Sequence, residues 1–202
     1  MKNTKFTMIT ILLIPIGIAI NFVGGQIAFA LKLPLFIDSI GTILVGVLAG
    51  SLLGGTTGLL TNIILSITNP SSIIWAPVNV LIGLVAGFCA KHNLFKKPLG
   101  AVITIIAIWG VSVLASVPIS VLAFGGATGS GASLITSFLI STGRGLWQSV
   151  FSSTIITESL DKVLSVLVAY VIVYSIPKRT ISKFPLGNKY IKGNDRDEEW
   201  DD

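Results

Sequence analysis

Three charged side chains lie close together in an otherwise apolar part of the sequence. Glu158, Asp161 and Lys162 are spaced so that a helix would carry them on a shared face. A fourth charge, Asp38, interrupts the apolar run LPLFIDSIGTIL at residues 33–44. Because a charge at the centre of a membrane helix costs about 2.5–3.5 kcal/mol on insertion scales, these residues are the most informative ones about function.

Amide and indole side chains accompany these charges. Asn62 and Asn69 are spaced i and i+7 on one expected helix face, and Trp75 and Asn79 flank the following turn. The set expected to contact a ligand is Asp38, Asn62, Asn69, Trp75, Asn79, Arg144, Trp147, Gln148, Glu158, Asp161 and Lys162. Because an arginine can bind a carboxylate through two parallel hydrogen bonds, Arg144 is the expected anchor for a small anion.

Each of these residues also has a purely structural interpretation. Glu158 and Lys162 form an i, i+4 pair whose charges would neutralise each other. The asparagines suit hydrogen bonds between helices, and the tryptophans suit the membrane–water interface. The ligand-binding interpretation rests on the placement of the whole set in one region.

The composition of the chain is that of a membrane protein. Hydrophobic residues make up 52% of the sequence and charged residues 11%, whereas a soluble domain carries roughly 25% charged residues. The net charge of +5 comes from basic segments that flank the apolar runs, so it does not indicate nucleic-acid binding. The single cysteine, Cys89, excludes an internal disulfide framework and offers no metal cluster.

Apolar runs of membrane-crossing length predict an all-α membrane domain with six helices. The expected helices span residues 7–26, 35–52, 56–69, 77–91, 98–123 and 153–176. Segments 70–76 and 133–145 fit either re-entrant segments or loops. The domain is expected to cover residues 1–180, followed by a disordered polar and acidic cytoplasmic tail at 181–202.

The basic residues orient these helices. They precede the first expected helix at Lys2 and Lys5 and follow the fourth and sixth at 91–97 and 178–192. The positive-inside rule therefore places both termini in the cytoplasm. The charged and amide residues then fall in the outer half, which predicts a pocket open to the outside rather than a channel. The glycine-rich segment 125–133 is expected to form a movable lid over it.

Glycines mark helix faces that another helix can approach closely. The regularly spaced ones are Gly46, Gly50, Gly54, Gly58, Gly83 and Gly87. Packing inside the bundle is the expected role, and docking of a second membrane subunit is the alternative. The stripe formed by Gly17, Asn21 and Gly25 in the first helix suits that docking role.

Sequence motifs for catalysis are missing. The sequence contains no H-E-x-x-H, no G-x-S-x-G and no paired Cys/His ligands, so we expect no enzyme, no metal and no cofactor. It also lacks a Walker motif, so ATP hydrolysis would belong to a partner. An outward pocket without an energy source indicates a binding subunit of a larger transporter.

The stretch LPLFIDSIGTILVGVLAGSLLGGTTGLLTNIIL, followed by APVNVLIGLVAGF, resembles the substrate-binding S components of energy-coupling factor (ECF) transporters. The resemblance implies a six-helix protein of the bacterial plasma membrane that captures a vitamin from outside. It also implies a transmembrane coupling protein (T component) and two ABC ATPases as partners, and a toppling motion that releases substrate inward. The family's alanine-x-x-x-alanine docking motif is replaced here by Gly17, Asn21 and Gly25, or by Ala19 with Val23.

The sequence is most similar to pantothenate-type members, and Arg144 and Lys162 suit the anionic pantothenate. Asp38 is then expected to be a counter-charge that positions one of these cations, or a hydroxyl acceptor. The alternatives are folate, or hydroxymethylpyrimidine and thiamin, which would require an available carboxylate. A membrane sensor and a small enzyme of lipid metabolism are the alternatives outside transport.

Overall fold

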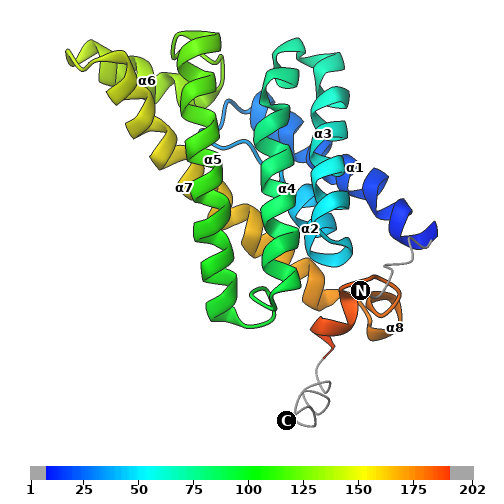
Figure 1. Ribbon diagram of the computed structural model, residues 1–202. Helices are drawn as coiled ribbons and strands as arrows, with labels where there is room; N and C mark the ends of the chain where they lie inside the picture. The colour runs from blue at the N-terminus through cyan, green and yellow to red at the C-terminus, as the bar shows by residue number, and fades with distance from the viewer. Residues whose placement is uncertain (1–7, 192–202) are drawn as a thin grey trace.

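Helices dominate the chain, which we describe from a computed structural model covering residues 8–191 (Figure 1). The elements are α1 (Met8–Ala30), α2 (Ile40–Ala49), α3 (Ser51–Thr68), η1 (Pro70–Trp75), α4 (Ala76–Lys91), α5 (Pro98–Phe124), α6 (Gly131–Ser141), α7 (Leu146–Ser175), α8 (Lys178–Ile181) and η2 (Gly187–Tyr190). Strands are absent from this part of the chain, so the all-α prediction is confirmed for it.

Four of the described helices are long and apolar enough to cross a membrane. They are α1, α3, the continuous unit η1–α4 at Pro70–Lys91, and α5. This agrees with the membrane class inferred from composition. Each of the six segments predicted to cross contains a helix, but α2 has only 10 residues and α7 contains three charged residues. Six crossings and cytoplasmic termini therefore stay predictions.

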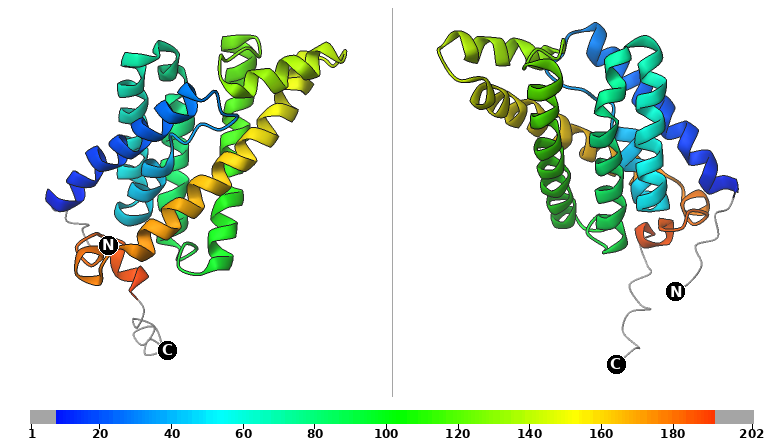
Figure 2. Two further views of the ribbon diagram at one scale, coloured as in Figure 1. Left: turned by 180° about the vertical axis from the view of Figure 1, so that it is seen from behind. Right: turned by 45° about the horizontal axis from the view of Figure 1, so that its top comes forward.

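Several helix boundaries differ from the prediction, and α1, for example, ends at Ala30 rather than at residue 26. The segment 31–39 is irregular rather than helical, and Lys32 and Ile37 adopt positive φ angles of 49° and 53°. The long connection 124–152 contains α6, and α7 begins at Leu146 rather than at residue 153. α6 packs on α7, and the pair projects beyond the other helices (Figure 2).

Glycines bring α2, α3 and α4 into backbone contact. A Cβ on Gly54 would lie 2.6 Å from the Cα of Gly46 and 2.7 Å from the carbonyl oxygen of Gly83. A Cβ on Gly83 would in turn collide with the Gly54 backbone. The expected role of this glycine spacing in internal packing is confirmed. The wholly buried α2 lies at the centre of the bundle, and Ile43 and Leu48 form part of the apolar core.

The chain after α7 folds back onto the bundle. The N–H of Leu186 donates to the carbonyl of Leu48 at 3.0 Å, and the Tyr190 ring packs in the core. The prediction that the tail begins at residue 181 is therefore wrong for 181–191, because apolar side chains at Ile181 and Phe184 are buried there. The rest of the predicted tail, 192–202, lies outside the described residues.

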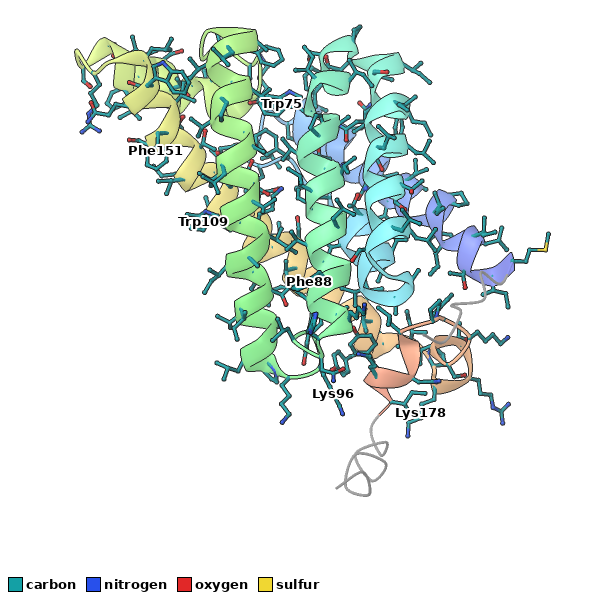
Figure 3. The ribbon with its side chains drawn as sticks, in the orientation of Figure 1. Trp75, Phe88, Lys96, Trp109, Phe151 and Lys178 are labelled. Atoms are coloured by element: carbon teal, nitrogen blue, oxygen red, sulfur yellow. The ribbon has the colours of Figure 1, made fainter. Side chains whose placement is uncertain are left out.

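The two ends of the bundle differ in chemistry. Lys96 and Lys178 lie at one end, together with the α4–α5 turn, α8 and η2, whereas Trp75 lies at the opposite end with η1 (Figure 3). Under the positive-inside rule, the lysine-bearing end is predicted to be cytoplasmic and the end with Trp75 to be the outer one.

Candidate ligand-binding site

A cavity of about 170 Å³ lies within the bundle. Its walls come from α1, segment 31–39, α3, η1, α4, α5, the loop 126–130, α6 and α7. Several of these segments are the turns at the end of the bundle that carries Trp75. Cavities of about 150 Å³ accept a molecule the size of benzene, so this one can hold a small organic ligand.

Seven of the eleven residues predicted to contact a ligand line this cavity. They are Asp38, Asn62, Asn69, Trp75, Asn79, Glu158 and Lys162. They come from five separate elements, so the fold brings together residues up to 124 positions apart in the chain. The glycine-rich segment predicted to be a lid also contributes to the walls, through Gly126 and Thr128–Ala132.

Arg144 lies outside the cavity, which corrects its predicted role as the carboxylate anchor. Arg144, Trp147 and Gln148 are exposed at the tip of the α6–α7 hairpin, and Trp147 is 53% exposed. The prediction placed these three residues in a connection between helices, with 133–145 as a re-entrant segment or a loop. The segment instead forms α6 and the start of α7, and the hairpin carries the three side chains away from the bundle.

The charged residues of α7 form a buried cluster. The Lys162 ammonium donates to Oδ2 of Asp161 at 2.6 Å and to Oγ of Ser39 at 3.4 Å. It also lies 3.4 Å from Oε2 of Glu158, a contact by charge without the geometry of a hydrogen bond. The other oxygen of Glu158 accepts a hydrogen bond from Ser116 at 3.2 Å. Lys162 therefore directs its donors at groups of the protein itself.

Asp161 does not line the cavity but holds one of its walls. Its Oδ1 accepts hydrogen bonds from the backbone N–H groups of Phe36 at 3.0 Å and Ile37 at 2.8 Å. A positive φ is rare for a β-branched residue such as Ile37, so these bonds stabilise an unfavourable backbone conformation. The predicted ligand-contact role of Asp161 is corrected to a positioning role.

Asp38 is half-buried and lines the cavity. Lys162 acts on its carboxylate electrostatically, but within residues 8–191 the ion pairs of Lys162 are with Asp161 and Glu158. The direct contacts that position Lys162 therefore come from Asp161 and Glu158, and the Asp38 carboxylate stands in the cavity wall. The roles expected for Asp38, a counter-charge or a hydroxyl acceptor, stay predictions.

A chain of hydrogen bonds fixes how two asparagine amides point. The Asn62 amide donates to the Ser72 carbonyl at 2.7 Å, and the Asn79 amide donates to Asn62 Oδ1 at 2.9 Å and to the Asp38 carbonyl at 3.3 Å. The Ser72 and Asp38 carbonyls at the two ends of this chain of hydrogen bonds can only accept. Reversing either amide would therefore place its oxygen against another acceptor. The Asn79 Oδ1 is left without a partner among the described residues.

Sequence reasoning missed the contribution of α5 and of the outer turns. Ser116 and Ser120 line the cavity from a helix that looked uniformly apolar. Together with Ser112 they recur at every fourth residue, on one face of the helix. This spacing is the sequence feature that could have predicted a polar face on α5. The cavity also includes Gln26 and the exposed Lys32 from the end of α1 and the segment that follows it.

The predicted docking stripe of α1 faces the interior of the bundle. Gly17 packs against Gly41, and Asn21 donates to Thr42 at 2.8 Å and to Thr61 at 3.0 Å. Gly25 lines the cavity. The docking prediction is therefore wrong for this face, because small and polar residues at this spacing serve helix packing equally well. The outward face of α1 is instead apolar, with side chains such as Leu12 and Ile16 exposed.

Residues 8–191 form an all-helical protein with several helices of membrane-crossing length and, near one end, a cavity whose mainly apolar lining carries charged and amide side chains. Comparison with models of known protein families, with curated protein sequences and with solved structures finds no match to this chain. The geometry of the pocket is therefore the basis for a functional proposal.

Proposed function

We propose that this protein is the substrate-binding subunit of a membrane transporter, similar to the S components of ECF uptake systems. The observation that carries the proposal is the cavity near the end of the bundle opposite the basic loops, where charged and amide side chains are set into a mainly apolar lining. That end is extracellular under the positive-inside rule, so the cavity would receive a small water-soluble molecule from outside.

The cavity does not continue through the bundle as a polar path. On its cytoplasmic side the centre of the bundle is an apolar core that contains Ile43, Leu48 and Val173, all fully buried. A molecule bound in the cavity could therefore reach the cytoplasm only after a rearrangement of the helices. We propose that a T component and two ABC ATPases supply the energy for this rearrangement.

Pantothenate no longer stands out among the candidate vitamins. Its choice depended on an arginine that would bind its carboxylate, and Arg144 lies at the exposed hairpin tip. The residues that line the cavity include the carboxylates of Asp38 and Glu158. This composition is closer to what hydroxymethylpyrimidine or thiamin would require.

Mass spectrometry of purified protein tests the proposal. A small polar molecule should be released on denaturation of the full-length protein purified from its native membrane. The variant Ser120→Phe, which fills the cavity from α5, should remain folded and release none. Co-purification of a transmembrane partner with two ATPases would support the transporter assignment. Release of lipids alone, with no such partners, would instead favour a lipid enzyme or a sensor.

A further inference from the structure

Building on the proposed binding function, we infer that the ligand is a small nitrogenous cation that donates at least two N–H hydrogen bonds, one to Glu158 and one to Asn79. The inference comes from hydrogen-bond acceptors that the protein leaves unused beside the cavity. The distribution of charge around them gives it independent support.

Two buried acceptors of the cavity lining have no hydrogen-bond partner. Six buried side-chain atoms of residues 8–191 are in this state, and only Oδ1 of Asn79 and Oε2 of Glu158 belong to residues that line the cavity. Asn79 and Glu158 are 4% and 3% exposed. An unsatisfied buried polar group is costly, and buried groups of this kind are normally paired. A ligand that donates to both would remove both costs.

The protein cannot satisfy the Asn79 oxygen by simple rearrangement, and it meets the Glu158 oxygen only with an ion pair. Rotating the Asn79 amide would place its oxygen against Asn62 Oδ1 and the Asp38 carbonyl, which are acceptors as well. Lys162 donates to Asp161 and Ser39 and contacts Oε2 of Glu158 at 3.4 Å as an ion pair without hydrogen-bond geometry. The Asn79 oxygen therefore requires a donor from outside the network, and the Glu158 oxygen, held only by its ion pair, can accept a hydrogen bond as well. A ligand in the cavity can supply both donors.

The charges around the cavity favour a cation over an anion. The carboxylates of Asp38, Glu158 and Asp161 act on a single buried ammonium, that of Lys162. When all four are ionised, negative charge is in excess, and Lys32 is the other cation that contributes to the cavity wall, from an exposed position. Because uncompensated buried charge is expensive, a cationic ligand would be stabilised and an anionic one repelled.

The size and lining of the cavity limit the ligand to about one ring. The volume of about 170 Å³ suits a single six-membered ring with short substituents. Phe29, Phe36 and Trp75 contribute aromatic surface to the walls. Aromatic faces attract planar cations, so a ring bearing an amidine or amino groups fits the lining better than a flexible acid does.

Three isosteric probes test the inference by isothermal titration calorimetry on the full-length protein in lipid nanodiscs. Benzamidine carries a cationic two-donor group, benzamide a neutral one and benzoate an anionic acceptor, all on the same ring. We expect benzamidine to bind at least about tenfold more tightly than benzamide, as for a hydrogen bond to a charged rather than a neutral group. Benzoate should show no measurable binding.

Three variants identify the residues that cause the preference for benzamidine. Glu158→Gln should reduce the advantage of benzamidine over benzamide to about twofold or less, because it keeps the shape of the side chain and removes its charge. Asn79→Ala should weaken both probes. Arg144→Gln, a charge removal at the exposed hairpin tip, should change neither. Circular dichroism and thermal unfolding establish that each variant is folded. The affinities of the three probes for the unaltered protein test the inference even if a variant fails to fold.

Several outcomes would overturn the inference. Equal or tighter binding of benzamide or benzoate would exclude a cationic ligand, and so would failure of all three probes to bind. The same conclusion follows if the molecule released from the purified protein is an anion. In each case, release of any small polar molecule would leave the proposed binding function intact.

Discussion

The backbone N–H of Ile37 donates a hydrogen bond of 2.8 Å to the carboxylate of Asp161, which lies 124 positions later in the chain. Asp161 is also bonded to the ammonium of Lys162 at 2.6 Å. One carboxylate thus joins the irregular segment 31–39 to the charged cluster on α7. Because both Asp38 in that segment and Lys162 line the cavity, Asp161 determines how two of its walls meet.

Replacing Asp161 by asparagine should destabilise the protein and loosen segment 31–39. Removing one partner of a buried ion pair costs up to about 3–5 kcal/mol, and Lys162 would keep only its longer contact with Glu158 at 3.4 Å. The carboxylate accepts three hydrogen bonds through its two oxygens, whereas the asparagine side chain has one oxygen and can keep only some of them. Thermal unfolding in detergent should show the loss of stability. Trypsin should cut faster after the exposed Lys32, at the start of the segment.

The triple variant Asp161→Asn, Lys162→Met and Glu158→Gln separates charge from shape, because Lys162 is paired with both carboxylates. Replacing all members of a buried charge cluster is often much less costly than removing one, so the triple variant should unfold at a higher temperature than Asp161→Asn alone. Its segment 31–39 should still be cut faster, since the hydrogen bonds to Phe36 and Ile37 are weakened. A single variant as stable as the unaltered protein would contradict the anchoring role of Asp161.

The sequence could predict the helices and their packing better than the site. Long apolar runs form helices in a membrane irrespective of their neighbours, and each of the six predicted segments contains a helix. Glycine spacing also predicts close packing, because a helix face without side chains permits it, as at Gly54 and Gly83. These signals are local, which is why they can be read from one sequence.

The errors concern contacts between distant segments. Pro34 in an apolar run looks like the start of a helix, but the N–H groups that follow bond to Asp161 instead. Arg144 looked like a ligand anchor because hydropathy does not show the direction in which the α6–α7 hairpin projects. Asn21 looked like part of a docking stripe, because a polar residue on a helix does not indicate which neighbour it faces.

The crossing of α3 and α4 should not tolerate a methyl group at Gly83. A Cβ there would collide with the backbone of Gly54, so the helices must separate. Overpacking of this kind typically costs about 1–3 kcal/mol, and Gly83→Ala should lower the unfolding temperature accordingly. The matched control is Gly110→Ala on α5, where a Cβ has no neighbour within 4 Å. It should stabilise the helix by up to about 1 kcal/mol. Equal effects of the two substitutions would show that helix propensity, not packing, governs Gly83.

Lys189 should stabilise the end of α4. Its ammonium donates to the carbonyl of Lys91 at 2.7 Å and to the side-chain oxygen of Asn93 at 2.7 Å. A cation at a helix C-terminus contributes about 0.3–1 kcal/mol, so Lys189→Ala should reduce stability by that amount. Hydrogen exchange should become faster in the last turn of α4. The neighbouring exposed Lys183→Ala serves as control and should leave exchange in α4 unchanged. Equal acceleration in both variants would indicate a general charge effect.

Substitution of Asp38 should weaken ligand binding, whereas substitution of Arg144 should not. Arg144 is exposed on the hairpin, so Arg144→Ala should change the affinity for benzamidine by no more than about twofold, the usual limit for a surface change. Asp38 is half-buried in the cavity wall, and Asp38→Asn should weaken binding about fivefold, as expected when a partly exposed ion pair worth about 1 kcal/mol is lost. Calorimetry at two salt concentrations checks the electrostatic origin, because added salt should reduce the difference between Asp38→Asn and the unaltered protein. Strong loss of binding in a folded Arg144→Ala protein would mean that the α6–α7 hairpin bends over the cavity when ligand binds, and that the arginine reaches the ligand after all.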